Sequence, residues 1–542
     1  MKQNIKILDC TLRDGGRIIN CEFSQFHING IIRELNRAKI DIIEVGFLRS
    51  KMKYNDNSTF FTEMDQLYDI LQAKDKYAEY VLFTDYGEEY GGWDFNKLPP
   101  CDDNTVKGIR LGFRKNDLDS AINTMRLIKD QGYNLYIQMI ETLNYSDLDF
   151  LRALEKINAL GPYAVGIVDT FGRMYKNDLL RFYTLADHNL FDNIYIDFHT
   201  HNNMQLSFAL AQEVVTLSHG KRNLILDATL NGMGKAAGNL NTELIVDYLN
   251  RQYGYNYDFD AVCDAIDDHI LWIKKEHFWG YSLPDLMSGI FSSHPNNVNY
   301  LQSKNRLRSK DIRYILSMVD AETRKRYDYD NLDQVYYNYS SSKYDDNENL
   351  QLLKSLLFNK TVLIIVFGKS IRDYSEKIKN FINSYNPVII GINHSYKEYQ
   401  PDFVFYGNHR RYCNDNIITN RTRKIVSSNI STNGKEEIVV EYCKLVSVGF
   451  RNYDNSTIML LNLLRNIGVS DIFIAGLDGF TNNESENYYD EIFSHNSIID
   501  ENDEIRNEEL KMLLKEYRSS LKKNQYVRFV TPSRFESLFV ES

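Results

Sequence analysis

The stretch that decides the fold lies near the start of the chain, where residues 5–16 read IKILDCTLRDGG. An apolar run, Ile5–Cys10, passes directly into a polar turn that ends in two glycines. Such short apolar runs are typical of strands that are buried on both faces. Similar runs recur through the first 240 residues, at Ile40–Phe47, Tyr80–Thr84, Val106–Phe113, Leu135–Ile140, Ala164–Asp169, Ile194–His199 and Leu224–Ala228.

Amphipathic segments separate these runs. In Phe23–Lys39, for example, apolar residues recur at close to helical spacing. Strand–helix units repeated in this way over roughly 240 residues predict a (β/α)8 barrel, a fold of about 250 residues. An open doubly wound sheet is the competing architecture. We therefore expect residues 1–258 to form a TIM barrel.

The remaining chain predicts three further parts. Residues 259–335 have a helical pattern and are expected to form an extension of the barrel. Residues 336–350 are polar and lack apolar periodicity, which indicates an exposed linker. Strand–helix alternation then restarts, so residues 351–542 are expected to form a Rossmann-like α/β domain with an open sheet.

Composition excludes several classes of protein. The chain has 542 residues and a net charge of −11, which argues against a nucleic-acid or acidic-membrane binder. Its six cysteines are scattered without a CxxC pair, as expected of reduced thiols in the cytoplasm. No apolar window is long enough for a membrane span, and the N-terminus does not resemble a signal peptide.

Polar residues gather at the ends of three predicted strands. Asp14 follows the first strand, His199 and His201 close the seventh, and Asn239 follows the eighth. Residues two apart in a strand point the same way, and the first, seventh and eighth strands are neighbours in a closed barrel. Two imidazoles, a carboxylate and an amide oxygen suit Mn²⁺ or Mg²⁺ better than a closed tetrahedral zinc site.

Four motifs carry a resemblance to a known family. TLRDG (11–15), IEVGF (43–47), HTHN (199–202) and GNLNTE (238–243) together resemble the DRE-TIM metallolyases. That family includes 4-hydroxy-2-oxovalerate aldolase, hydroxymethylglutaryl-CoA lyase, isopropylmalate synthase and homocitrate synthase. The resemblance implies the same four metal ligands, an enolate-stabilising role for Arg13, and a role for Glu44 in holding Arg13.

Two departures from the family's motifs indicate which type of reaction to expect. The Claisen-condensing synthases read RDGEQ where this chain has Arg13-Asp14-Gly15-Gly16-Arg17, so their Glu is missing. The oxovalerate aldolases carry a general-base His that we place at Ile18, so this base is missing too. We therefore favour aldol or retro-aldol chemistry of a pyruvate-type enolate, with a 2-oxo acid and an aldehyde, sugar-derived aldehydes among them, as substrates. A Claisen-type acyl-CoA synthase or lyase is an alternative.

Other polar residues are candidates for proton transfer and substrate binding. Tyr281 is the counterpart of an aldolase Tyr and is expected to be catalytic, with Arg17, His294 or a metal-bound water as alternative proton carriers. Arg110, Gln138 and Thr170 lie at or near predicted strand ends, so we expect them to bind substrate. Their alternative is a structural role.

The second α/β pattern contains Gly368-Lys369-Ser370 after a strand. A P-loop is excluded because Leu363 stands where its first glycine should be. The turn still predicts a phosphate cradle. Together with the downstream motifs GIN (391–393), PDFVF (401–405) and GLDGF (476–480), it weakly resembles the sialyltransferase-like Rossmann domains of bacterial surface-glycan proteins. This resemblance implies a nucleotide-sugar partner. We expect a homo-oligomer, and a glycan-assembly transferase with the barrel as scaffold is the alternative function.

Overall fold

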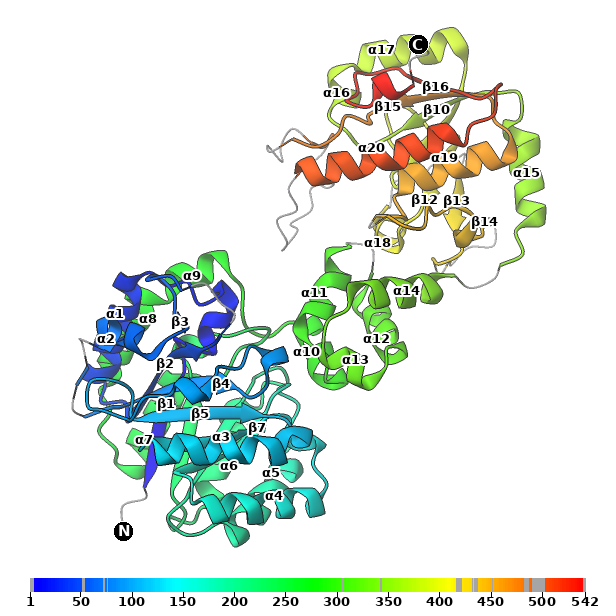
Figure 1. Ribbon diagram of the computed structural model, residues 1–542. Helices are drawn as coiled ribbons and strands as arrows, with labels where there is room; N and C mark the ends of the chain where they lie inside the picture. The colour runs from blue at the N-terminus through cyan, green and yellow to red at the C-terminus, as the bar shows by residue number, and fades with distance from the viewer. Residues whose placement is uncertain are drawn as a thin grey trace. The chain divides into compact units, whose positions relative to one another are not determined.

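The computed structural model describes residues 4–50, 54–71, 74–75, 77–304, 307–341, 344–415, 422–430, 432, 437–450, 452–481, 487–489 and 503–539. The chain divides into two compact units, Met1–Pro295 and Asn296–Ser542, whose elements are labelled in Figure 1. No helix among the described residues has both the length and the apolar composition needed to cross a membrane.

The first unit is a closed parallel barrel, as the sequence predicts. Its strands are β1 (Ile5–Asp9), β2 (Ile42–Leu48), β4 (Glu79–Asp85), β5 (Gly108–Phe113), β6 (Asn134–Met139), β7 (Ala164–Asp169), β8 (Tyr195–Thr200) and β9 (Leu224–Ala228). Each pairs with its neighbours in parallel, and β1 closes the ring by pairing with both β9 and β2. The short β3 (Phe60–Phe61) adds a parallel pair beside β2. The TIM-barrel prediction is confirmed.

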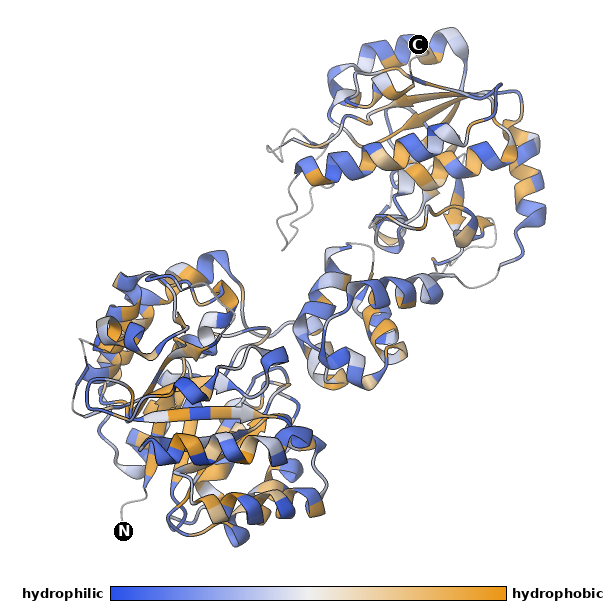
Figure 2. Cartoon of the chain, viewed as in Figure 1, coloured by the Kyte–Doolittle hydropathy of each residue, from blue (hydrophilic) through white to orange (hydrophobic). Residues whose placement is uncertain are grey.

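Helices surround the strands. They are α1 (Gln25–Arg37), α2 (Leu67–Ile70), α3 (Leu118–Asp130), α4 (Asp147–Leu160), α5 (Lys176–Asn189), α6 (Ser207–Leu217), α7 (Thr242–Tyr253) and α8 (Phe259–His269). Figure 2 shows apolar residues on the strands and polar residues on much of the outer surface of the helices. In α4, the Ser146 hydroxyl caps the N-terminus by accepting a hydrogen bond from the amide of Asp149, and Gly161 ends the helix in the left-handed conformation.

The barrel interior changes character along its axis. One layer is apolar and contains Leu8, Ile42, Val81, Tyr136, Ala164, Tyr195 and Ile225. Two residues further along several of these strands lie charged or polar side chains instead, among them Glu44, Gln138, Asp197 and Asp227. Because alternate residues of a strand face the same side, this charged layer stands between the apolar layer and the carboxyl ends of the strands.

The chain between the barrel and the second sheet is helical. Its elements are α9 (Leu271–Glu276), α10 (Leu283–Phe291), α11 (Pro295–Ser303), α12 (Ser309–Met318), α13 (Ala321–Lys325), α14 (Tyr329–Ser340) and α15 (Asn347–Leu357). The predicted exposed linker at 336–350 needs correction, because α14 continues to Ser340, and Tyr336 is buried and donates a hydrogen bond to Asp454. Residues 342–343 of that segment lie outside the described residues. The boundary between the compact units falls earlier, at 295/296.

The second unit contains a parallel sheet of order β14-β13-β12-β11-β10-β15-β16. The strands are β10 (Thr361–Ile365), β11 (Val388–Ile392), β12 (Phe403–Tyr406), β13 (Arg423–Ser427), β14 (Ile438–Val440), β15 (Asp471–Ala475) and β16 (Tyr526–Phe529). Helices of this unit include α16 (Ser370–Asp373), α17 (Ser375–Tyr385), α18 (His409–Asn414), α19 (Ser456–Ile467) and α20 (Asp503–Ser519). The chain runs outward from the central β10 in one direction and then returns to its other side, which is the arrangement of a doubly wound fold.

Candidate active site

Three neighbouring strand ends bring Asp14, His199 and His201 together. The Nε2 atoms of His199 and His201 lie 3.9 and 3.7 Å from Oδ2 of Asp14. One ligand atom from each of the three side chains lies within 4.8 Å of the others. A divalent ion held about 2.1 Å from each atom fits such a spacing.

Asn239 presents a fourth oxygen to this group. Its backbone forms an isolated bridge with His201, and its side-chain Nδ2 donates a hydrogen bond to the carbonyl of Met233 at 3.0 Å. Gly234 makes this packing feasible, because a Cβ there would lie 2.4 Å from Nδ2 of Asn239. Oδ1 of Asn239 and Oδ2 of Asp14 are buried without a hydrogen-bond partner among the described residues. Two buried oxygens left unpaired beside two imidazoles fit a metal ion.

Both histidines are poised as neutral ligands. Nδ1 of His199 lies 2.8 Å from Oδ2 of Asp227, so the carboxylate accepts the Nδ1 proton and leaves Nε2 with its lone pair. Burial lowers the pKa of His199 and of His201 to about 4 in each case. At neutral pH both rings are therefore uncharged, which is the form that binds a metal ion.

Arg13 connects Asp14, a candidate metal ligand, to strand β2. Its Nε donates to Oε2 of Glu44 and its Nη1 to Oδ1 of Asp14, both at 2.6 Å. Burial alone would raise the pKa of Asp14, but Arg13, His201, Arg17 and His199 together hold it well below the usual range. The structure therefore places Glu44 where the sequence expects it, as the partner that orients the Arg13 guanidinium.

The chain is similar in sequence to known proteins. A family model described as HMGL-like matches residues 113–268. The 4-hydroxy-2-oxovalerate aldolase of Geobacillus genomosp. 3 is 26% identical over 258 residues, which cover 46% of this chain and 72% of that protein. The 4-hydroxy-2-oxovalerate aldolase of Roseiflexus castenholzii is 24% identical over 275 residues, covering 48% and 76%. A solved N-terminal domain from Bacteroides vulgatus is 24% identical with a TM-score of 0.45, covering 55% of this chain and 96% of that one.

The barrel is similar to the DRE-TIM metallolyases. That family consists of divalent-metal-dependent enzymes, and the matched relatives indicate that the chain is a carbon–carbon lyase.

Arg110 and Gln138 lie elsewhere in the barrel than the sequence suggests. Arg110 is fully buried and donates to Glu44, Asp197 and Asp227, and Gln138 is 3% exposed and donates to Asp197. Nη1 and Nη2 of Arg110 and Nε2 of Gln138 are engaged inside the charged layer of the barrel. The expectation that Arg110 and Gln138 contact substrate is therefore corrected: they hold the carboxylates beneath the metal-ligand set.

Thr170 and Tyr281 are not among the candidate metal ligands Asp14, His199, His201 and Asn239. Oγ1 of Thr170 accepts a hydrogen bond from the amide of Glu141 at 2.8 Å, which gives it a role in joining two strand-end loops. The side chain of Tyr281 is 53% exposed. The adjacent Gly280 amide donates to the carbonyl of Ala236, so this loop lies beside the loop that follows β9.

Three residues near the ligand set have no distinctive sequence pattern. Asp227 is one residue of the apolar run that forms β9, Arg49 follows the IEVGF motif, and Lys235 lies in the glycine-rich loop before Asn239. The interior register of β9 is the signal that could identify Asp227, because Ile225 two residues earlier also faces the barrel interior.

The predicted phosphate cradle of the second unit is filled by its own chain. Asp478, in the loop after β15, accepts hydrogen bonds from the Ser370 amide at 2.7 Å and from the Ser370 hydroxyl. The Gly368 amide donates to the carbonyl of Gly476, and a Cβ at Gly368 would lie 2.5 Å from that oxygen. Gly368 is thus required for loop packing. The phosphate-cradle role expected of Gly368 and Ser370 is corrected, because their amides are already engaged, and the role expected of Lys369 stays a prediction.

Proposed function

We propose that the chain is an aldolase that makes or cleaves a carbon–carbon bond next to a 2-oxo acid through a pyruvate-type enolate. The observation that carries this proposal is the pairing of an open metal-ligand set with the guanidinium of Arg13. The two histidines, Asp14 and Asn239 would hold the ion, and their mixed nitrogen and oxygen donors favour Mn²⁺ or Mg²⁺. When bound, such an ion supplies Lewis-acid stabilisation of negative charge on oxygen.

The side chains of the barrel suggest how the enolate is stabilised. Nε and Nη1 of Arg13 are engaged by Glu44 and Asp14, and Nη2 has no hydrogen-bond partner among the described residues. We assign Nη2 to the keto oxygen of the 2-oxo acid, where negative charge develops as the enolate forms. A preorganised donor at such an oxygen contributes about 10²–10³-fold to the rate.

In the addition direction, a proton leaves C3 of the 2-oxo acid and the resulting enolate carbon attacks the carbonyl carbon of the aldehyde. One carbon–carbon bond forms, and the former carbonyl oxygen gains a proton to give a 4-hydroxy-2-oxo acid. Cleavage is the reverse of these steps. Arg17 and His294 are two of the proton carriers that the sequence offers. The charge of Arg17 lowers the pKa of Lys235, and the charges of Lys235 and Arg17 add to the effect of burial in lowering the pKa of His294.

The relatives support this choice of chemistry over acyl-CoA condensation, since the matched proteins are named 4-hydroxy-2-oxovalerate aldolases. A role in bacterial surface-glycan synthesis is a proposal that rests on the weak resemblance of the second unit. A nucleotide sugar bound at the Gly368 turn is not part of it, because Asp478 and Gly476 engage the donors of that turn.

Exchange of the C3 protons of pyruvate with solvent tests the proposed function without a second substrate. In D₂O, the full-length protein with Mn²⁺ should deuterate the pyruvate methyl group, followed by proton NMR. Chelation with excess EDTA should abolish the exchange, and added Mn²⁺ should restore it. Absence of exchange with Mn²⁺ and with Mg²⁺ would refute an enolate mechanism.

A further inference from the structure

Three cationic side chains stand around the proposed metal ligands, and none of them is a proposed ligand or the proposed stabiliser of the enolate. Arg17 follows β1, Arg49 follows β2, and Lys235 lies in the loop after β9. These strands are consecutive neighbours in the barrel, in the order β9-β1-β2. All three residues therefore lie at the carboxyl ends of the strands, and we call them the cationic rim.

Phe47 brings the two arginines of the cationic rim together. The guanidinium carbons of Arg17 and Arg49 lie 4.8 and 4.7 Å from the centre of its ring. Arg17 also contacts the metal-ligand set directly, with its Nε 3.2 Å from Oδ1 of Asp14. The rim thus begins at the ligand set and extends away from it along β2.

The charges of Arg17 and Arg49 also act on Lys235. It is half-buried, and its pKa is lowered first by burial and then by Arg17, with a smaller contribution from Arg49 in the same direction. The carboxylate of Asp14 acts in the opposite direction and does not cancel these effects. A cation held among other cations in a partly buried position is destabilised unless an anion accompanies it.

The carboxylates nearby compensate the charge of the cationic rim only in part. Arg17 must share Oδ1 of Asp14 with Arg13, which binds the same oxygen at 2.6 Å. Arg49 has its own partner, Asp85, at 2.9 Å. Lys235 forms no ion pair in the part of the chain that the structure describes, and a divalent ion on Asp14 would add further positive charge.

We propose that the electrophilic substrate carries a phosphate or carboxylate group of its own, which the cationic rim binds. This inference rests on the proposed aldolase function and names the class of its second substrate. The carboxylate and keto oxygen of the 2-oxo acid are accounted for by the metal-ligand set and Arg13. A second anionic group, on the aldehyde, is what remains for Arg17, Arg49 and Lys235.

The test compares small aldehydes with and without an anionic group. Full-length protein with Mn²⁺ and pyruvate is assayed with propanal, with succinic semialdehyde and with glyceraldehyde 3-phosphate, by following the loss of pyruvate. At least one anionic aldehyde should exceed propanal in kcat/KM by about 10–100-fold, the effect expected of one or two charge-assisted contacts. The carboxylate and phosphate arms identify which group the rim accepts.

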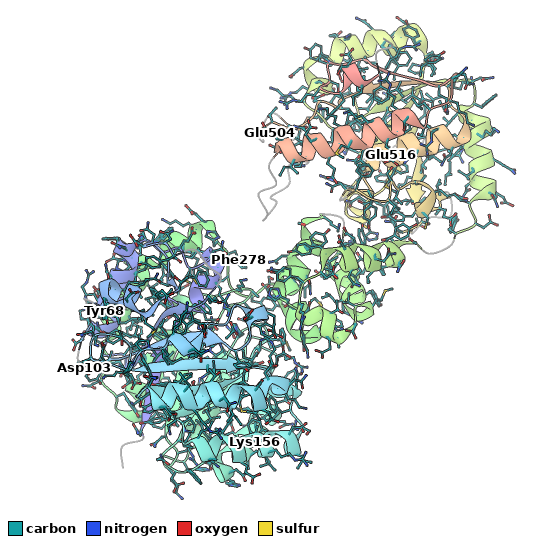
Figure 3. The ribbon with its side chains drawn as sticks, in the orientation of Figure 1. Tyr68, Asp103, Lys156, Phe278, Glu504 and Glu516 are labelled. Carbon is teal, nitrogen blue, oxygen red and sulfur yellow. The ribbon has the colours of Figure 1, made fainter. Side chains whose placement is uncertain are left out.

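Variants assign the preference to the rim. Lys235→Met should reduce kcat/KM for the preferred anionic aldehyde about 10-fold or more, mainly through KM, and leave the value for propanal within about 2-fold. Lys156→Met on α4, a lysine of the outer helices labelled in Figure 3, is the matched control and should change neither. Raising the salt concentration should weaken the anionic preference, because exposed charges are screened.

The outcomes separate this inference from the proposed function. Methyl-proton exchange of pyruvate that persists while propanal reacts as well as the anionic aldehydes would overturn the anionic substrate and leave the aldolase intact. An anionic preference that survives Lys235→Met and Arg49→Met unchanged would also overturn it, since the rim would then not be its source. Loss of the exchange itself would instead refute the proposed function.

Discussion

Oδ2 of Asp227 lies 2.8 Å from Nδ1 of His199, and the same oxygen accepts a hydrogen bond from the guanidinium of Arg110. One carboxylate thereby fixes the tautomer of the imidazole that we propose as a metal ligand, and it balances the charge of Arg110 inside the barrel. The relationship joins the metal-ligand set to the charged layer beneath it, and it makes Asp227 a positioning residue.

Replacing Asp227 by Asn should weaken metal binding about 10–100-fold, because the amide no longer stabilises the Nδ1–H tautomer of His199 as a carboxylate does. Isothermal titration with Mn²⁺ measures the change. Asp192→Asn, on an exposed carboxylate, is the control and should leave the affinity unaltered. Equal affinities for Asp227→Asn and the unmodified protein would show that the hydrogen bond does not tune the metal.

Replacing His201 by Ala should abolish stoichiometric binding of Mn²⁺ and the exchange of pyruvate methyl protons, because one of four ligands is lost. The side chain of His201 is 19% exposed, so the fold should persist by circular dichroism. His188→Ala on α5 removes an exposed imidazole and should retain both properties. A His201→Ala protein that binds metal as tightly as before would exclude His201 from the ligand set.

Replacing Arg13 by Lys should slow the exchange of pyruvate protons by about 10²–10³-fold while metal binding changes little. Lysine keeps the charge but cannot bind Glu44, Asp14 and a substrate oxygen with one planar group. Mn²⁺ titration and the exchange rate are measured on the same sample. Arg126→Lys on α3 serves as the exposed control. An unchanged exchange rate for Arg13→Lys would place the enolate elsewhere.

Asp9 should make the protein less stable as the pH rises from 4 to 7. Burial raises the pKa of Asp9 from 3.8 to about 6 in the folded protein. The folded state therefore holds the proton more tightly than the unfolded chain, so this contribution is full below about pH 4 and is lost as the pH rises through 6. A difference of two units corresponds to about 3 kcal/mol. Urea unfolding measures the free energy of unfolding across this pH range. Its change between pH 4 and 7 should be smaller for Asp9→Asn than for the unmodified protein by that amount.

The control for this prediction is Asp130→Asn, an exposed carboxylate at the end of α3. It should show the same dependence on pH as the unmodified protein. If Asp9→Asn also retained the full dependence, the buried carboxyl of Asp9 would not be its source.

A fragment of residues 1–295 should fold and bind Mn²⁺, because it is a compact unit that includes all four proposed ligands. Cooperative thermal unfolding and metal titration provide the measurement. A fragment that ends at residue 258 is the comparison, and it should be less stable because it lacks α8, which packs on α1. An insoluble 1–295 fragment would show that the barrel needs the rest of the chain.

Much of the barrel could be predicted because each strand is an apolar run bounded by polar residues. Strands that are buried on both faces are apolar throughout, which distinguishes them from surface strands with alternating apolar and polar residues. Two elements show where this signal ends. Strand β16 reads YVRF and exposes alternate residues, and β3 contains only two residues. The helix α14 is rich in tyrosine and polar residues, so its sequence resembles a linker although Tyr336 is buried.

In the candidate site, the residues at strand ends could be predicted from the sequence, whereas the position of Arg110 could not. Asp14, His199, His201 and Asn239 stand in short local motifs at strand ends, and the barrel topology alone brings them together. Arg110 has the same sequence signature, a polar residue in a buried run, yet it lies deeper and is enclosed by carboxylates. Depth along the barrel axis depends on the stagger of the strands, which the sequence of one strand does not contain.

The shared carboxylate of Asp227 also limits how this barrel can be redesigned. A substitution that adapts the ligand set to another metal alters the charge facing Arg110, and a change at Arg110 on β5 alters the basicity of His199 on β8. Directed evolution of metal preference should therefore recover compensating pairs that include Asp227, Arg110 or Asp197 more often than single changes at the ligands.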